Sequence, residues 1–454
     1  MSRSARARWL GLTTVVAVMS IAACTPGAGS QDGASDEPAA AIETDISGLG
    51  DLTLTVWDQE VRGGQNEQIE QLNAAFEEKY PNVTIDRVSQ SFDDLATTLR
   101  LALSDNEAPD VVQANNGRNT MGAFVEAGQL LPLNEYAEAY GWYDRFPQSV
   151  LQYSTYSADG ATFGEGNVYG LPQVGEVVGV FYNKAKLDAL SLEVPTTWDA
   201  FEEALSTAKA AGEVPMQLGN IEGWPGGHVF GPLQGAFVDP ADITKLGLGN
   251  AGASWTTPEN EAAAAQLQGW VDAGYFNEGV NGTDYDAAWQ ALAGGTGVFL
   301  IGGSWLAADL QDAMGEGIGF FGLATEEGGP IATTGGTGLP FAVTKGSENP
   351  DAAAAYIDFL TSDDAMEIIA ETGNLPVNRT AELAPADGVL ADVYAVFGEV
   401  TTNGSLLPYL DYATPTFGDT LNQSLQDLLA GQVTPTAFTE ALEADYGQFV
   451  GDAG

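Results

Sequence analysis

Strand and helix patterns alternate along this chain from residue 51 onward, and this alternation constrains the fold more than any other feature. Alternating apolar and threonine residues indicate strands, whereas apolar residues at helical spacing indicate helices. The first predicted elements are a strand at residues 51–57, a helix at 66–80, a strand at 83–85, a helix after the capping box Ser91-x-x-Asp94 and a strand at 109–112. This order predicts an α/β fold with a mostly parallel sheet covered by helices.

The same alternation resumes further along the chain. The later predicted elements are a strand at 177–181, a helix capped by Thr196-x-x-Asp199, a strand and helix at 297–305, a strand at 339–343, a helix opened by Asn349-Pro350 and a helix capped by Thr361-x-x-Asp364. From about residue 390 the pattern is mostly helical. A chain of 454 residues is long enough for two large lobes.

The amino terminus has the pattern of an export signal. Residues 1–23 combine a basic start with an apolar run of roughly 15 residues, too short to span a bilayer. Ile21-Ala22-Ala23-Cys24 resembles the bacterial lipobox, which predicts that Cys24 carries the lipid (palmitate) that anchors the exported chain to the outer face of the membrane. The alternative is ordinary cleavage after Ala23 beside an incidental cysteine. Residues 24–50 are predicted to form a flexible tether.

Charge and rare residues exclude several functions. The chain has 63 acidic and 15 basic residues, a formal net charge of −48, which would repel a nucleic-acid backbone. With one cysteine and one histidine, it has no internal disulfide and no Cys/His zinc cluster. A Ser-His-Asp triad would need His228, which we interpret as a loop histidine rather than a catalytic base. No metal and no cofactor are expected.

Several stretches together resemble one known family. They are residues 54–57 and the helix ending at 79–81, residues 108–112 and 124–133, residues 168–172, 180–184 and 195–198, residues 302–305, and residues 338–341, 349–350 and 375–379. Their order and spacing are similar to those of the bacterial extracellular solute-binding proteins of family 1, the maltose-binding-like sugar receptors of ABC importers. The resemblance covers roughly residues 50–450.

The resemblance implies a two-lobed periplasmic-binding-protein-like (type II) fold with a hinge and an interlobe ligand cleft. It implies a first lobe of residues 51–173 plus 338–378 and a second lobe of residues 174–337 plus 379–454. The implied function is capture of a sugar and its delivery to membrane permease subunits, by a monomer without enzymatic activity.

Polar residues that follow strands are candidates for the cleft, because ligands of open α/β sheets bind beyond the carboxyl ends of strands. This rule picks out the loop Asp58-Gln59-Glu60, in which Gln59 is the candidate contact, the pair Asn115 and Asn116 with the nearby Arg118, and Gly303 with Ser304. The asparagines could instead serve only to form a turn. They also stand where members of the family commonly have an acid.

Aromatic rings and charged groups complete the candidate site. Trp305 follows a glycine pair and could stack on a sugar ring, or else pack in the core. Trp224 lies in a glycine-rich segment and carries the same two alternatives. Glu176 is a lone acid beside an apolar strand and would accept hydroxyl protons, unless it is a solvated strand end. Arg379 would be a further ligand contact or a lone surface ion pair.

Two other hypotheses remain open at this point. A secreted glycoside-processing enzyme would need only two carboxylates about 5–10 Å apart. The same fold could also bind a non-sugar solute such as an amine or a peptide. A strongly anionic ligand is disfavoured because the chain has so few cations.

Overall fold

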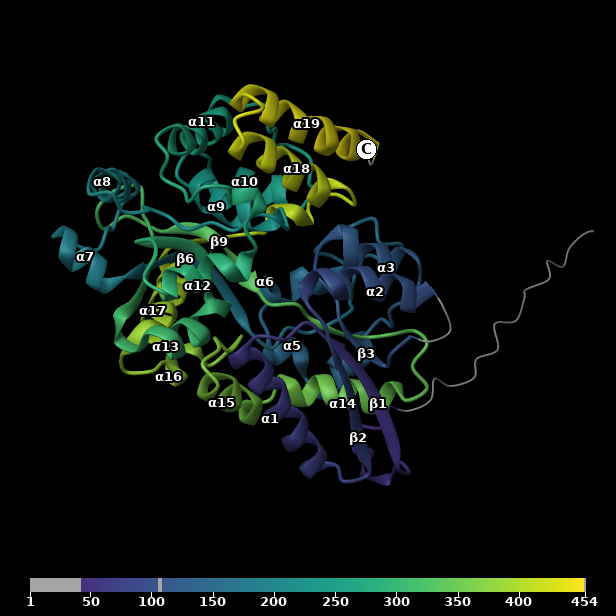
Figure 1. Cartoon of the computed structure of the whole chain (residues 1–454). Helices are drawn as coiled ribbons and strands as arrows, with labels where there is room; N and C mark the ends of the chain where they lie inside the picture. The colour runs from purple at the N-terminus through teal and green to yellow at the C-terminus, as the bar shows by residue number, and fades with distance from the viewer. Residues whose placement is uncertain (1–41, 105–107, 453–454) are drawn as a thin grey trace, which may run out of the picture. The chain divides into compact units, whose positions relative to one another are not determined.

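A computed structural model describes residues 42–104 and 108–452. The predicted signal peptide, Cys24 and most of the predicted tether lie outside these residues. The body contains two main sheets, which lie in separate parts of it (Figure 1).

The first sheet has four strands in the order β10-β3-β1-β2. Their bounds are β1 Leu52–Asp58, β2 Val83–Ser89, β3 Val111–Gln113 and β10 Phe341–Val343. β1 lies between β2 and β3 and is parallel to both, whereas β10 pairs antiparallel with β3. The alternation in the amino-terminal sequence therefore predicted this sheet correctly, apart from the strand that returns from far along the chain.

Helices cover this sheet with their apolar faces. They include α1 (Gly63–Lys79), α2 (Phe92–Ser104), α14 (Pro350–Leu360) and α15 (Asp363–Glu371). In α1, Ile69, Leu72 and Phe76 recur at helical spacing and are fully buried. The ring of Phe76 meets the edge of Tyr356 from α14 at a centroid distance of 5.2 Å. This packing fixes α1, whose first turn faces the site described below.

The second sheet is antiparallel at its centre, which differs from the parallel arrangement expected from strand and helix alternation. Its strands are β6 Gly175–Asn183, β7 Phe299–Gly303, β8 Ile318–Phe321, β9 Ala332–Thr337 and β11 Ser405–Leu407. β6 pairs antiparallel with β7, β8 and β9. Only β11 runs parallel to its neighbour, β9. β7 to β9 all return beside β6, which is buried along most of its length.

Two helices pack on the second sheet from opposite sides (Figure 1). α9 (Trp224–Gln234) contacts β7 and β9, and α17 (Gly388–Asn403) contacts β8 and β6. Phe230 of α9 and Val393 of α17 belong to different hydrophobic clusters. The sheet therefore separates two cores.

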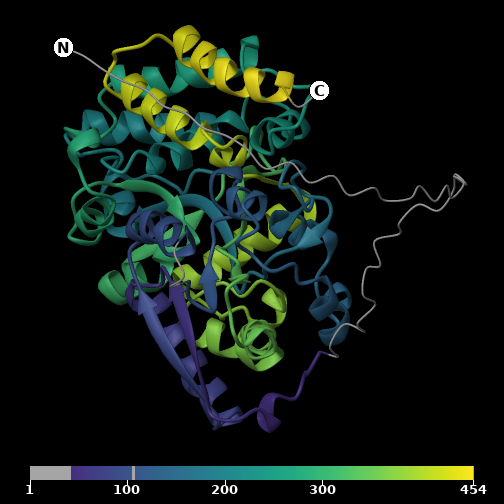
Figure 2. The same cartoon turned by 90° about the vertical axis from the view of Figure 1, so that its right-hand side faces the viewer.

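The remaining helices complete the body. The remaining helices before residue 384 are α3 Ala123–Glu126, α4 Asn134–Tyr140, α5 Trp142–Arg145, α6 Gln148–Leu151, α7 Lys184–Leu190, α8 Trp198–Ala210, α10 Pro240–Gly247, α11 Pro258–Asp272, α12 Tyr285–Ala293, α13 Ala307–Met314 and α16 Thr380–Leu383. The carboxyl-terminal pair is α18 Phe417–Leu429 and α19 Pro435–Asp452, and the short strands β4 Thr155–Tyr156 and β5 Asn167–Val168 form a small ribbon. Figure 2 shows α18 and α19 at the end of the body remote from β1 and β2.

Three segments far apart in sequence cross side by side between the sheets. The backbone N–H of Gly175 donates to Leu375 O at 2.8 Å, and that of Gly338 donates to Val174 O at 3.0 Å. The chain thus passes from one sheet to the other near residues 174, 338 and 376.

Three details of the sequence prediction need correction. Thr197, not Thr196, accepts the hydrogen bond that caps α8, and Ser362, not Thr361, caps α15. In each case the residue with an extended backbone directly before the helix is the cap. Residues 42–50, expected within the tether, pack on the body: Ile46 is fully buried, and Asn82 Nδ2 donates to Ile46 O at 3.0 Å.

No helix among the described residues combines the length and the apolarity that crossing a bilayer requires.

Candidate functional site

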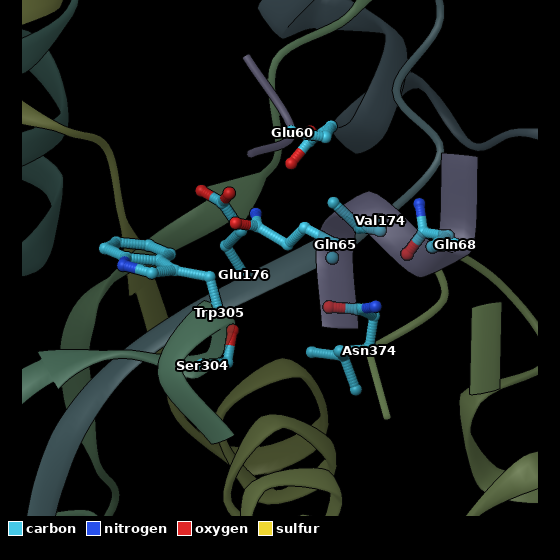
Figure 3. Close-up of a pocket in the computed structure, with 10 residues that line it drawn as sticks. Glu60, Gln65, Gln68, Val174, Glu176, Ser304, Trp305 and Asn374 are labelled. Atoms are coloured by element: carbon cyan, nitrogen blue, oxygen red, sulfur yellow. The ribbon is translucent and has the colours of Figure 1, made fainter. Parts of the chain in front are cut away.

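A polar pocket lies where the crossing segments meet the end of β1, the first turns of α1 and the end of β7 (Figure 3). The residues that line it are Glu60, Gln65, Gln68, Val174, Gly175, Glu176, Ser304, Trp305, Asn374 and Leu375. Both sheets therefore contribute side chains to one site.

Glu60 is held in place by a buried ion pair beside it. Asp58, at the end of β1, is fully buried, and its Oδ2 accepts a hydrogen bond of 2.6 Å from Arg87 Nε within an ion pair. The same guanidinium donates from Nη2 to the backbone oxygen of Glu60 at 2.8 Å. Gln113, at the end of β3, donates from Nε2 to Glu60 Oε1 at 2.7 Å. The loop after β1 is therefore fixed so that Glu60 faces the pocket.

The second oxygen of Glu60 has no partner within the described part of the chain. Glu60 is 3% exposed, and its Oε2 makes no hydrogen bond with any described residue. Burial raises the pKa of Glu60 to about 7, and the neighbouring Asp58 adds to this rise. A buried carboxyl oxygen without a donor is costly. Glu60 is thus prepared to accept a hydrogen bond from a bound molecule.

Glu176 lies across the pocket on β6. Its Oε2 accepts a hydrogen bond of 2.8 Å from the hydroxyl of Tyr409. Burial raises the pKa of Glu176 to about 7, and the negative charge of Glu60 raises it further. Figure 3 shows the Gln65 side chain of α1 extending toward this carboxylate, with the indole of Trp305 on its other side.

Trp305 is positioned by glycine before it and tyrosine beside it. A Cβ atom on Gly303 would lie 2.1 Å from the Trp305 ring, so the indole occupies space that only glycine leaves open. Trp305 Nε1 donates to the hydroxyl of Tyr285 in α12 at 2.8 Å. The indole is therefore held in one orientation at the pocket wall.

Trp305 belongs to a cluster of packed aromatic rings next to the pocket. The His228 ring lies 5.3 Å from Trp305, 5.4 Å from Tyr409 and 5.1 Å from Trp224, measured between centroids. Burial lowers the pKa of His228 to about 3, so the imidazole is neutral at physiological pH. The segment expected to be a loop is in fact the start of α9, which begins at Trp224 and carries His228.

Further pocket groups are amides. Gln65 and Gln68 project from the first turns of α1, and the Oε1 atom of each is buried without a hydrogen-bond partner among the described residues. Asn374 Nδ2 donates to the backbone oxygen of Gly64 at 3.1 Å. Carboxylates, amides and an indole together can accept and donate hydrogen bonds and cover an apolar ring face. Within residues 42–104 and 108–452, no cluster of three or more His, Cys, Asp or Glu side chains is arranged to hold a metal ion.

The structure brings together three of the residues selected from the sequence: Glu176, Ser304 and Trp305 line the pocket. Gly303 lies beneath Trp305. Trp224 packs at 4.5 Å from the ring of Tyr285, within the aromatic cluster next to the pocket.

The other selected residues lie elsewhere. Gln59 is buried, and its backbone N–H donates to Gln113 Oε1 at 2.9 Å. Asn115 Nδ2 is 3.5 Å from Asp411 Oδ2, a carboxyl group whose pKa burial raises to about 6. Asn116 is fully buried and donates to Tyr153 O at 2.7 Å.

Arg379 forms ion pairs with Glu367 and Glu382 at 3.1 and 2.6 Å, and it is not among the pocket residues. This placement matches the alternative of a surface ion pair. A contact between Arg379 and a ligand stays a prediction.

Sequence reasoning missed several pocket residues. Glu60 was picked out with Asp58 and Gln59 as part of the loop after the first strand, but Gln59 was chosen as the ligand contact, whereas Glu60 lines the pocket. Gln65 and Gln68 lie next to the apolar face of α1, and this position was the only, weak indication in the sequence that they are buried. Tyr409 is not a lining residue but holds Glu176 in place; it follows a short strand 233 residues after Glu176, and nothing in its local sequence indicated the contact.

Comparisons with known proteins agree with one another. A family model described as "Bacterial extracellular solute-binding protein" matches residues 63–367. A multiple sugar-binding protein of Streptococcus mutans is 24% identical over 307 residues, which are 66% of this chain and 70% of that protein. The maltodextrin-binding protein MdxE of Bacillus subtilis is 27% identical over 354 residues, which are 73% of this chain and 75% of that protein.

Solved structures show the same fold. A chitin oligosaccharide binding protein matches with a TM-score of 0.74 and 23% identity, covering 88% of this chain and 99% of the other. The GacH receptor of Streptomyces glaucescens matches with a TM-score of 0.72 and 19% identity, covering 88% of this chain and 99% of the receptor chain. These likenesses confirm the predicted two-lobed, type II periplasmic-binding-protein fold.

Proposed function

This chain belongs to the bacterial extracellular solute-binding protein family, and on that basis we propose that it captures a sugar in the pocket between the two sheets and delivers it to the permease subunits of an ABC importer. It is an exported receptor rather than an enzyme. Relatives named for sugar or maltodextrin binding support the choice of ligand.

The observation that carries this proposal is the arrangement of Glu60, Glu176 and Trp305 around one pocket. The two carboxyl groups and the glutamine amides can accept hydrogen bonds from hydroxyl groups on opposite sides of a sugar ring. The fixed indole supplies a flat surface for the apolar C–H face of the ring. Since Glu60 Oε2 has no partner among the residues that the structure describes, a ligand hydroxyl would satisfy a buried acceptor.

Release of the ligand requires the pocket to open. We assign residues 51–173 plus 338–378 to a first lobe and residues 174–337 plus 379–454 to a second lobe. The crossing segments near residues 174, 338 and 376 would form the hinge. Attachment of lipid at Cys24 would hold the exported monomer beside its permease.

Titration calorimetry with neutral mono- and oligosaccharides tests the proposal. We expect one ligand per chain, with a dissociation constant near micromolar, about 8 kcal/mol of binding free energy. Trp305→Ala should weaken binding at least about tenfold. Glu440→Gln, an exposed change on α19, should leave it unchanged. Absence of heat with every sugar would contradict the proposed function.

Two carboxyl groups in one pocket would also suit a glycoside hydrolase. The named relatives are binding proteins, and we therefore expect oligosaccharides incubated overnight with the protein to be recovered intact. Shorter products on chromatography would favour the hydrolase.

A further inference from the structure

The pocket is acidic, and none of the described residues that line it is basic. Glu60 and Glu176 are its two ionisable lining groups, and the other lining residues are neutral. The two nearby arginines are already engaged. Arg87 is bound to Asp58, and Arg62 pairs with Asp286 at 3.1 Å while lying 5.3 Å above the ring of Tyr285.

The protein partners of the two carboxyl groups are themselves uncharged. Glu60 Oε1 receives an amide N–H from Gln113, and Glu176 Oε2 receives a hydroxyl from Tyr409. The other oxygen of Glu60, Oε2, is buried and makes no hydrogen bond with any described residue. In Figure 3 these carboxyl groups face the same space, with Gln65 and Trp305 beside it.

Desolvated carboxylates that no cation pairs with directly are unfavourable, and a cation placed between them offsets part of that cost. Burial raises the pKa of both groups to about 7, so each is easily protonated in the empty pocket. An ammonium group has three N–H donors and could satisfy the free oxygens while keeping both carboxylates charged. The face of the Trp305 indole would add attraction for a positive charge.

Resting on the proposed function, we propose that the preferred ligand is a sugar bearing a protonated amine, whose ammonium group lies between Glu60 and Glu176. Unsubstituted neutral sugars bind the same pocket more weakly. Acetylation of the amine removes the positive charge and hence the preference. Sugars bearing a carboxylate or phosphate are rejected, because no lining residue is basic.

Calorimetry with matched ligands tests this inference at about pH 7.5. Each neutral sugar is compared with its 2-amino-2-deoxy and 2-acetamido derivatives, as monosaccharides and as disaccharides, in both the gluco and the galacto series. We expect the free amine of the best series to bind at least about tenfold more tightly than the neutral member. Glu60→Gln and Glu176→Gln should each remove most of this advantage, whereas Glu440→Gln should retain it.

A second measurement does not depend on these variants folding. With the wild-type protein, the amine advantage should fall at least about fivefold as the pH is lowered from about 7.5 to 5.5, because both carboxyl groups become protonated. The charged groups around Glu60 are Asp58, Arg62 and Arg87, of which Asp58 and Arg87 form the buried pair, and Glu176 faces Glu60 and the hydroxyl of Tyr409. An advantage that does not change with pH would contradict the inference.

The outcomes separate the two proposals. If neutral or acetylated sugars bind as tightly as the amines, this inference is wrong and the sugar-binding function stands. If no member of the panel binds, the proposed function fails and the inference fails with it.

Discussion

Arg62 and Asp286 form an ion pair of 3.1 Å that joins the start of α1 to α12. Arg62 directly precedes α1, the helix that carries Gln65 and Gln68, and Asp286 neighbours Tyr285, which orients Trp305. Trp289 Nε1 also donates to Asp286 Oδ1 at 3.0 Å, which holds the carboxylate in place. The contact therefore links the two walls of the pocket without lining it.

Arg62→Ala should weaken the binding of every neutral sugar by the same factor, about tenfold. A partly exposed ion pair contributes about 0.2–1 kcal/mol and a cation–π contact about 0.5–1 kcal/mol. Because Arg62 does not line the pocket, its loss should disfavour the closed state without discriminating between ligands. Calorimetry with several sugars measures the factor, and Lys245→Ala, which breaks the exposed pair with Asp242, is the control. Factors that differ strongly between sugars would show instead that Arg62 contacts the ligand.

Tyr285→Phe should reduce sugar affinity about tenfold while the protein remains folded. The change removes the acceptor for Trp305 Nε1, and an unsatisfied buried donor costs about 1–3 kcal/mol. The indole would then leave the orientation needed for stacking. Tyr143→Phe, at an exposed tyrosine, is the matched control. Unchanged affinity in Tyr285→Phe would mean that the hydrogen bond does not position the indole.

Glu60→Gln should stabilise the ligand-free protein at about pH 8 and have little effect at about pH 5. The folded-state pKa of Glu60 is about 7, above its ordinary value of 4.5. Between these values the folded protein holds a proton that the unfolded chain releases, so this group lowers stability as the pH rises. The gain at pH 8 should be up to about 3 kcal/mol.

Urea denaturation of both proteins at the two pH values measures this difference. His228, whose pKa is lowered, acts with the opposite sign but is common to both proteins and cancels. An equal stability difference at pH 5 and pH 8 would contradict a raised pKa at Glu60.

Arg379→Ala should leave sugar affinity within about twofold of the wild type. Its guanidinium is paired with Glu367 and Glu382, which are exposed, so its loss should change the stability of the protein only slightly. Calorimetry and thermal unfolding check both values. A tenfold loss of affinity would restore Arg379 as a ligand contact.

Local patterns predicted the first sheet well because its strands follow one another in sequence. Residues 51–57 alternate visibly, and β1 then pairs with the next two strands. The second sheet was harder, since β6 pairs with strands more than 100 residues away, and their antiparallel direction leaves no local signal. Thr196 and Thr197 offer two adjacent hydroxyl groups, and only the backbone conformation decides which one caps the helix.

The candidate site was predictable only where a local sequence pattern marked its residues. Glu176 and Trp305 stand out locally, as an acid beside an apolar strand and an aromatic residue after glycines. Asn116 also followed a strand, but its amide is used by Tyr153 and Tyr412 within the protein. Which polar group stays free depends on tertiary partners that sequence spacing does not reveal.

Equilibrium dialysis of a labelled sugar against the wild-type protein and Trp305→Ala tests the central claim most directly. We predict that the wild type retains one sugar per chain, that the sugar elutes unchanged on chromatography after release, and that Trp305→Ala retains little at the same concentration. No retention by the wild type, equal retention by Trp305→Ala, or recovery of a chemically altered sugar would contradict the account.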